Sequence, residues 1–281
     1  MSADTTRGGR SPGIDRSPST IRQRVLRGAI GTTAFLVLWT VAALQFPVYL
    51  LPAPLEVAAA FAGQLSATAT YTTPVVEAPL ALPAILTHLL QSLQHYLPGL
   101  LIGSTLGVTL GVLVGWFAAV DDALTPVIRV LRPIPPLAWV AFAIVWFGIG
   151  HTGATFIVSI GAFWITFYNA LSGVESVDSA VLEAAASLGV HDHPTMLRKV
   201  VLPAASPGIF TGLRTSIGQC WMIVVAAELV GPPGVGEEIL IAAQNLALDV
   251  SVAYMLVISI VFLASDAAFR AVEREVLAWQ T

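Results

Sequence analysis

The sequence predicts an all-α membrane protein with six transmembrane helices and with both termini in the cytoplasm. Hydrophobic residues make up 56% of the chain and charged residues 11%, whereas about a quarter of the residues of a soluble domain are charged. The mean hydropathy is +0.81. Several apolar stretches are long enough to cross a bilayer as helices, which takes about 20 residues.

Apolar length places the six spans. No charged residue lies between Arg132 and Glu175. Glycines at 148, 150 and 153 interrupt this run near its middle, so we expect two helices there. The six expected spans are residues 28–50, 97–120, 134–147, 154–171, 207–230 and 251–272.

The basic residues predict the orientation, because loops rich in Lys and Arg stay in the cytoplasm. The three segments expected outside, residues 52–96, 148–153 and 231–250, contain no Lys or Arg. Arg214, in the fifth span, is expected to extend toward the inner boundary. The other basic residues all fall inside: Arg7, Arg10, Arg16, Arg22, Arg24, Arg27, Arg129, Arg132, Arg198, Lys199, Arg270 and Arg274. We therefore expect a multi-pass protein of the cell membrane.

The first 84 residues divide into three expected parts. Residues 1–27 are rich in Ser, Thr, Arg and Gly, which favours a disordered cytoplasmic tail. The apolar run at 28–50 is too long for a signal peptide and predicts a retained anchor helix. Residues 51–84 predict an external loop with a low-complexity patch at 66–74.

An amphipathic helix is expected from Ile85, lying on the outer membrane surface before the second span. His88 and His95 belong to its polar or flanking positions. As a metal pair they lack a carboxylate or thiol companion, so an interfacial polar face is the expected role.

The second span carries a glycine at every fourth position. Small residues at this spacing let another helix backbone approach closely inside a membrane. The pattern therefore predicts a packing groove at the centre of the bundle, with a substrate groove as the alternative. The glycines are Gly99, Gly103, Gly107, Gly111 and Gly115.

Three prolines, Pro133, Pro135 and Pro136, precede the third span. They remove backbone donors, so this helix must begin after an extended entry. Irregular backbone at membrane depth is tolerated where protein buries it or where it lines a cavity. The prolines are therefore candidates for a pathway wall or a hinge, with a simple kinked helix start as the alternative.

Catalytic and nucleotide-binding patterns are absent from the sequence. Lys199 is the only lysine and no glycine-rich stretch precedes it, which excludes a P-loop of the GxxxxGK[ST] type. The segment GPPGVG at 231–236 predicts a plain turn. No Ser/His/Asp set or metal-ligating cluster is evident, Cys220 fits a buried hydrophobe, and the spread of charges excludes a nucleic-acid partner. We expect this chain to bind no metal or cofactor.

Ionisable residues near the spans bear on the driving force. Glu228, Arg214 and Asp266 all lie toward the ends of their predicted helices, and none is at a predicted midplane. An ion-coupled transporter is expected to carry an ionisable group near the membrane midplane, so this placement argues against ion coupling. Asp266 and Arg270, four residues apart, are expected to pair on one helix face.

The segment 174–206 predicts a cytoplasmic loop that contains short helices. Helix-forming residues follow Ser179, and Gly189 predicts the end of this first helix. A second short helix is expected from Pro194, and the fifth span is expected to begin with Ser206 as its cap and Pro207 as its first residue.

At this loop the sequence resembles the EAA signature of permease subunits of binding-protein-dependent ABC importers. Flanking segments are similar to the branch that imports nitrate, sulfonates, taurine and related anions: RPIPPLAWVAFAIVWFGIG from Arg132, NALSGVESVD from Asn169 and FTGLRTSIG from Phe210. The twelve residues between Gly189 and Leu202 make a longer spacing than the family pattern. The residues that match the signature are Glu183, Ala184, Ala185, Gly189, Leu202 and Pro203.

The resemblance implies a permease core of the type I ABC importers over residues 85–275. It also implies a homodimer of permeases, two ATPase subunits docked on the cytoplasmic loop with ATP and Mg²⁺, and an external solute-binding protein. The expected cargo is a small solute, in particular an anion such as nitrate, a sulfonate, taurine or bicarbonate. An ion-coupled secondary transporter or channel is the alternative, and a membrane scaffold is a third. The importer permease is favoured over a secondary transporter because the sequence shows no inverted repeat and no charge at a predicted midplane.

Overall fold

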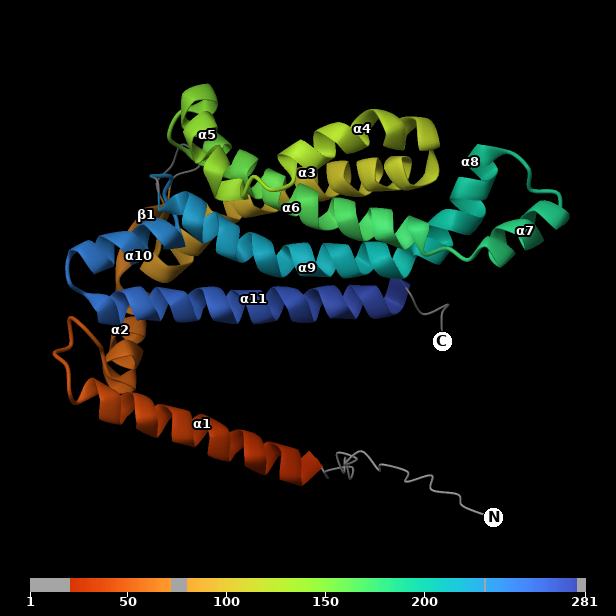
Figure 1. The fold of residues 1–281 in the computed structure, drawn as a ribbon. Coiled ribbons are helices and arrows are strands. Elements are labelled where there is room, and N and C mark those ends of the chain that lie inside the picture. The colour runs from red at the N-terminus through yellow and green to blue at the C-terminus, as the bar shows by residue number, and fades with distance from the viewer. Residues whose placement is uncertain (1–20, 72–79, 230, 277–281) are drawn as a thin grey trace, which may run out of the picture.

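The computed structural model describes residues 21–71, 80–229 and 231–276 as a bundle of helices (Figure 1). Four long helices lie side by side, and α6 packs against both α3 and α9, while α11 packs against α9. They are α3 (Ala84–Trp116), α6 (His151–Glu175), α9 (Leu202–Glu228) and α11 (Leu248–Val276).

The two ends of this bundle carry different short elements. One end, called here the α7 end, carries α7 (Ser179–Ser187) and α8 (His193–Met196). The opposite end, the α10 end, carries α10 (Val235–Gln244) and α5 (Val140–Phe147). The first residue of α1 and the last residue of α11 both lie toward the α7 end (Figure 1).

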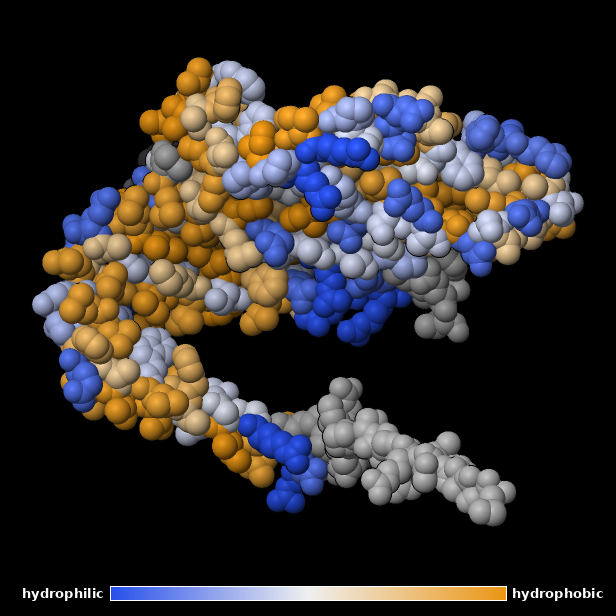
Figure 2. Space-filling view, in the orientation of Figure 1, coloured by the Kyte–Doolittle hydropathy of each residue, from blue (hydrophilic) through white to orange (hydrophobic). Residues whose placement is uncertain are grey.

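Within the described residues, five helices are long and apolar enough to cross a membrane, and a bent pair makes a sixth candidate. The bent pair consists of α4 (Ala118–Leu131) and the segment Pro136–Phe147, which meet at 85°. Figure 2 shows hydrophilic residues gathered over α7, α8 and the end of α11, with apolar surface toward the α10 end. The predicted all-α membrane fold is confirmed.

The first helix, α1 (Ile21–Ala43), begins before the predicted start at residue 28. Residues 21–27, predicted as part of a disordered tail, are helical, and residues 1–20 of that tail lie outside the described structure. The helix ends at Ala43, before the predicted end at residue 50. The chain then turns at Pro47, whose carbonyl accepts a hydrogen bond from Leu50 N at 2.8 Å. Its apolar window has no buried residue.

The predicted loop at 51–84 contains regular structure. Pro54 starts α2 (Pro54–Ser66), and the Glu56 carboxylate accepts from Ala53 N at 2.7 Å, which satisfies a donor at the start of the helix. β1 (Thr68–Tyr71) and β2 (Leu80–Pro83) then pair antiparallel. Part of the low-complexity patch, residues 72–74, lies outside the described residues.

The expected surface helix from Ile85 is the first part of α3, so the second span begins earlier than residue 97. Tyr96 is buried and donates from its hydroxyl to Ile217 O at 2.9 Å. His95 is also buried. These contacts hold this part of α3 inside the bundle, so the interfacial role expected for His95 is wrong.

The fifth span also begins earlier than predicted, because the chain is helical from His193 to Glu228 through α8, a π-helical turn η2 (Leu197–Val201) and α9. Pro207 lies inside α9 and is not its first residue. Proline has no N–H for the carbonyl of Pro203, and Ser206 Oγ donates to that carbonyl at 2.8 Å instead. Ser206 therefore stabilises the helix interior, where a cap was expected.

Candidate coupling loop and translocation groove

The five glycines of α3 face α6 and form what we call the glycine seam. A Cβ atom on Gly99 would lie 2.7 Å from Val158 Cβ, and one on Gly115 would lie 3.0 Å from Val174 Cβ. A Cβ atom on any of the other three would meet a backbone carbonyl of α6; these glycines are Gly103, Gly107 and Gly111. Helix backbone therefore fills this face of α3 and leaves no room for a solute there.

A buried polar cluster joins four helices at the α10 end of the seam. His95 Nε2 of α3 lies 2.8 Å from Glu228 Oε1 of α9, and both side chains are fully buried. His95 Nδ1 lies 2.9 Å from Nδ1 of His151, the first residue of α6. The other carboxylate oxygen of Glu228 accepts from Gly236 N of α10 at 2.7 Å. The cluster thus gives the buried Glu228 carboxylate its hydrogen-bond partners, and it gives Gly236 N, near the start of α10, an acceptor that the helix itself does not supply.

The segment 231–236 makes space for this cluster, which is more than the plain turn expected from the sequence. A Cβ atom on Gly234 would collide with the Glu228 carboxylate, and one on Gly236 would lie 2.8 Å from Glu228 Cβ. Sequence reasoning placed Glu228 near a helix end and His95 on an interface, so it missed their contact. A carboxylate in an apolar run followed by closely spaced glycines was the available signal.

The three prolines lie at the bend between α4 and the 3₁₀ helix η1 (Pro136–Trp139). Pro133 and Pro135 are exposed, and Pro136 is the first residue of η1. Beside them the Arg132 guanidinium lies 4.4 Å from the centroid of the Tyr168 ring, a cation–π contact that ties the bend to α6. The structure thus places the prolines at a sharp bend, and their role in a pathway or hinge stays a prediction.

The α7 loop, our name for the predicted cytoplasmic loop at 174–206, contains a helix with well-defined ends. The Asp178 carboxylate accepts from Ala180 N at 2.9 Å and caps the start of α7. At the other end Gly189 adopts a φ of +91°. Gly189 N donates to Ala186 O at 2.9 Å and Val190 N to Ala185 O at 3.1 Å, which is the Schellman pattern. The predicted stop at Gly189 is confirmed.

The two faces of α7 differ. Leu182, Ala185 and Ala186 pack toward Met196 and Val201 of this chain. The rest of its surface is exposed and carries two large apolar side chains, Val181 within α7 and Leu188 directly after it, the latter 86% exposed. Of the residues that match the signature, Glu183, Ala184 and Gly189 are exposed, whereas Ala185, Leu202 and Pro203 are half-buried.

The turn after α7 is also capped. Asp192 accepts from Thr195 N at 2.9 Å at the start of α8. Hydrogen bonds from Thr195 hold the pKa of the Asp192 carboxyl below its usual value. The longer spacing between Gly189 and Leu202 is thus taken up by a capped turn and a π-helical turn.

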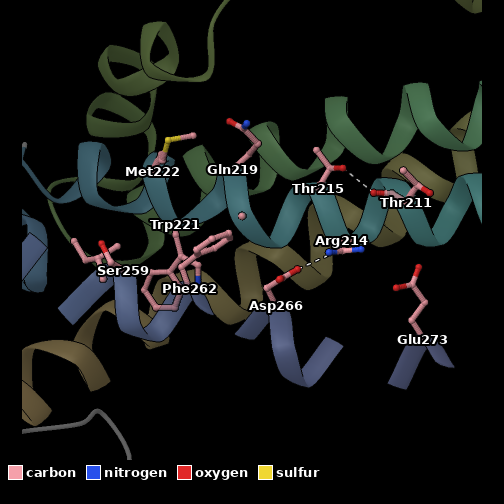
Figure 3. A pocket seen from close by; sticks show the side chains of 12 residues that line it. Thr211, Arg214, Thr215, Gln219, Trp221, Met222, Ser259, Phe262, Asp266 and Glu273 are labelled. Carbon is pink, nitrogen blue, oxygen red and sulfur yellow. Dashed lines mark hydrogen bonds and ion pairs between the residues drawn. The ribbon is translucent and has the colours of Figure 1, made fainter. Parts of the chain in front are cut away.

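A groove of about 590 Å³ lies between α9 and α11 (Figure 3). Arg214 Nε donates to Asp266 Oδ1 at 2.9 Å across the groove. Arg270 binds the other oxygen of Asp266, as expected from their spacing. Arg214 therefore forms an ion pair between α9 and α11. The sequence predicted only that its side chain extends toward the inner membrane boundary.

The sequence matches the family described as the binding-protein-dependent transport system inner membrane component, over residues 103–277. This chain belongs to that family. The matched region of this inner membrane component includes the glycine seam from Gly103, the bent pair, the α7 loop and the groove.

Relatives of this chain are named as permeases of transport systems. It is 40% identical over 59% of its length to a putative ABC transporter permease of Methanocaldococcus jannaschii. It is 37% identical over 59% of its length to the taurine transport system permease TauC of Escherichia coli. It is also 40% identical over 47% of its length to the bicarbonate transport system permease CmpB of Synechococcus elongatus. The matched segments span 63%, 60% and 48% of those proteins, respectively.

Solved structures share the fold. A chain of the inward-facing MetNI methionine ABC transporter superposes with a TM-score of 0.56 at 20% identity, covering 67% of the permease and 95% of that chain. A chain from an amino acid ABC transporter crystallised with histidines superposes with a TM-score of 0.53 at 18% identity, covering 67% and 90%, respectively. This chain therefore shares its helical fold with these chains of two ABC transporters.

Proposed function

We propose that this chain is the membrane subunit of an ABC importer and forms the translocation pathway for a small oxyanion. Membership of the family supports the transport role. Relatives named for taurine, aliphatic sulfonates and bicarbonate support the solute class, because all three carry an anionic oxygen group. An external binding protein delivers the solute in this proposal.

The observation that carries the proposal is the α7 loop. It lies at one end of the bundle, its start is capped, and its end is fixed by Gly189. Its exposed face offers Glu183, Ala184 and Leu188 to a partner. We propose that a separate ATPase docks here, so that its closure on ATP moves α7 and the helices packed behind it.

The orientation and stoichiometry follow from the same proposal. The α7 end faces the cytoplasm, in agreement with Arg198, Lys199, Arg270 and Arg274 near that end. Two copies of the permease pair with two ATPase subunits. ATP and Mg²⁺ are bound by the ATPase, and this chain holds no cofactor.

Two α7-loop variants test the docking role. Gly189→Val forces a β-branched residue into a left-handed conformation, although no atom lies within 4 Å of the added Cβ. Leu188→Glu leaves the backbone relaxed and places a charge on the exposed face. We expect either change to lower ATPase co-purification in mild detergent, and ATP-driven uptake, by about tenfold, the equivalent of one lost anchor contact.

Gly63→Val is the matched control, because a Cβ there also meets no atom within 4 Å and its φ is not positive. This variant should retain the ATPase. Full retention of the ATPase by both α7-loop variants, in folded protein, contradicts docking at this loop.

A further inference from the structure

The middle of the exposed face of α9, from Thr211 to Gln219, is polar, whereas its neighbours expose mainly apolar surface. On α3 and α11 this surface is formed mainly by large apolar residues, such as Leu101 and Leu106 on α3 and Ile260 and Leu263 on α11. The exposed residues of α9 before Leu229 recur every three or four positions along one face. They are Ala204, Pro207, Thr211, Thr215, Gln219 and Met222.

Gln219 is the member of this face that lipid tolerates least. It lies nine positions before Glu228 at the end of α9, which is about 14 Å of helix, or roughly half of the hydrocarbon thickness. The hydroxyls of Thr211 and Thr215 each donate to a carbonyl of α9 at 2.8 Å, to Pro207 O and Thr211 O, respectively. Within the described residues, the Gln219 amide has no such partner.

An exposed, unpartnered amide near the middle of the membrane requires water or another polar group beside it. Gln219, Thr215 and Thr211 line the same groove as Arg214. Figure 3 shows Arg214 on the side of α9 toward Asp266, whereas Thr215 and Gln219 project from the other side of the helix. The groove lining therefore combines neutral hydrogen-bonding groups of this face with one guanidinium from the adjoining side of α9.

The charges of this groove are partly balanced. Asp266 binds Arg214 through Nε and also binds Arg270, so two cations share one carboxylate. The Arg214 side chain is 40% exposed, and its two terminal nitrogens take no part in the Asp266 hydrogen bond. Glu273 lines the groove further toward the α7 end. The two arginines and the two carboxylates therefore balance in number, and Arg214 is the cation that lines the groove.

We propose that the Thr211–Met222 face of α9 lines the path of the small oxyanion, with the Gln219 amide as its mid-membrane contact and Arg214 as its next contact toward the α7 end. This inference rests on the proposed function. The amide N–H groups donate to the anionic oxygens, and the fixed guanidinium attracts the anion after it passes Gln219. An apolar lining would offer neither interaction.

Water access tests the inference without using transport as the readout. In the complex with its ATPase, Gln219→Cys is treated with a small sulfonate-bearing methanethiosulfonate, a charged reagent that stays out of lipid. Leu106→Cys, on the exposed face of α3, is the matched control. The wild-type chain gives the background, since its Cys220 is buried. We expect labelling at position 219 to be about tenfold faster or more, because only a hydrated thiol ionises readily.

Excess taurine or an aliphatic sulfonate should slow labelling at 219 and leave the control unchanged. Equally slow labelling at both positions overturns the inference, because it places Gln219 against lipid or against a packed second copy. Fast labelling at 219 that no oxyanion slows also overturns it.

A charge swap tests the contact itself. Gln219→Glu keeps the side-chain shape and is expected to lower ATP-driven oxyanion uptake by about tenfold or more through like-charge repulsion. Thr109→Val on α3 should leave uptake unchanged. Normal uptake by Gln219→Glu contradicts the inference alone, whereas a wild-type complex that shows no ATP-driven uptake, with 219 still labelled, contradicts only the proposed function.

Discussion

The glycine seam and the groove between α9 and α11 are both contacts between long helices, but they contain opposite kinds of residue. The seam lacks side chains on α3, so backbone meets backbone along its length. The groove is open, and its lining combines apolar side chains such as Phe262 with charged and polar ones such as Arg214 and Gln219. A tight seam resists sliding, whereas an open polar groove can change its width at low cost.

The same contrast occurs on the two sides of α9. Its inner side carries Gly208 and Gly212, where a Cβ atom would lie 3.0 Å from Gly173 Cα and 2.5 Å from Asn169 Cβ of α6, respectively. Its outer side carries the exposed polar face. We infer that α3, α6 and the inner side of α9 form a rigid core, and that the changes that accompany transport concentrate at the other side of α9.

The largest effect is expected from filling the seam. Gly107→Leu would drive a side chain into Thr166 Oγ1 and the Phe163 carbonyl, and backbone cannot move aside. We expect a loss of stability of about 3 kcal/mol or more, seen as loss of the folded peak in detergent size-exclusion chromatography. Gly31→Leu, in α1, has no atom within 4 Å of its Cβ and should fold normally. Equal folding of the two variants contradicts a tight seam.

The buried polar cluster that closes the seam should rank second. Glu228→Leu removes the partner of His95 Nε2 and Gly236 N together, which leaves buried polar groups unpaired and is expected to cost about 2–3 kcal/mol. Glu228→Gln keeps an acceptor for Gly236 N and should cost about 1 kcal/mol. Thermal unfolding in detergent measures both. A Glu228→Leu variant as stable as Glu237→Gln, a half-buried site on α10, would show that the cluster contributes no stability.

The groove should tolerate change best. Asp266→Asn weakens the pairs with Arg214 and Arg270, but partial exposure limits the loss to about 1 kcal/mol or less. Because the freed guanidinium groups raise the positive charge of the groove, the apparent KM for an oxyanion should change although folding does not. A large loss of stability would place Asp266 in the rigid core instead.

Much of this fold follows from the sequence by simple reasoning. Apolar length predicted most of the long helices, and the four-residue glycine period predicted close packing of α3. The element boundaries failed where tertiary contacts outweigh local signals. Pro207 was expected to start a helix, but Ser206 takes the carbonyl that proline leaves free, so the helix continues through it.

The polar sites were harder to predict because each depends on residues far apart in the chain. His95 and Glu228 are 133 positions apart, and neither residue alone indicates a buried pair. Asp266 and Arg270 are four positions apart on one helix and were predicted correctly, whereas Arg214 joins them only through the packing of α9 on α11. The exposed polar face of α9 likewise depends on knowing which side of the helix is covered.

ATP-driven uptake into proteoliposomes tests the central proposal, that a separate ATPase at the α7 end drives this permease, most directly. The vesicles hold the permease and its ATPase, with the binding protein and a labelled oxyanion on the α10 side and no ion gradient. The proposal predicts accumulation only when ATP is on the α7 side, and its loss in Leu188→Glu. Accumulation driven by an ion gradient without ATPase or ATP would contradict the proposal and indicate a secondary transporter.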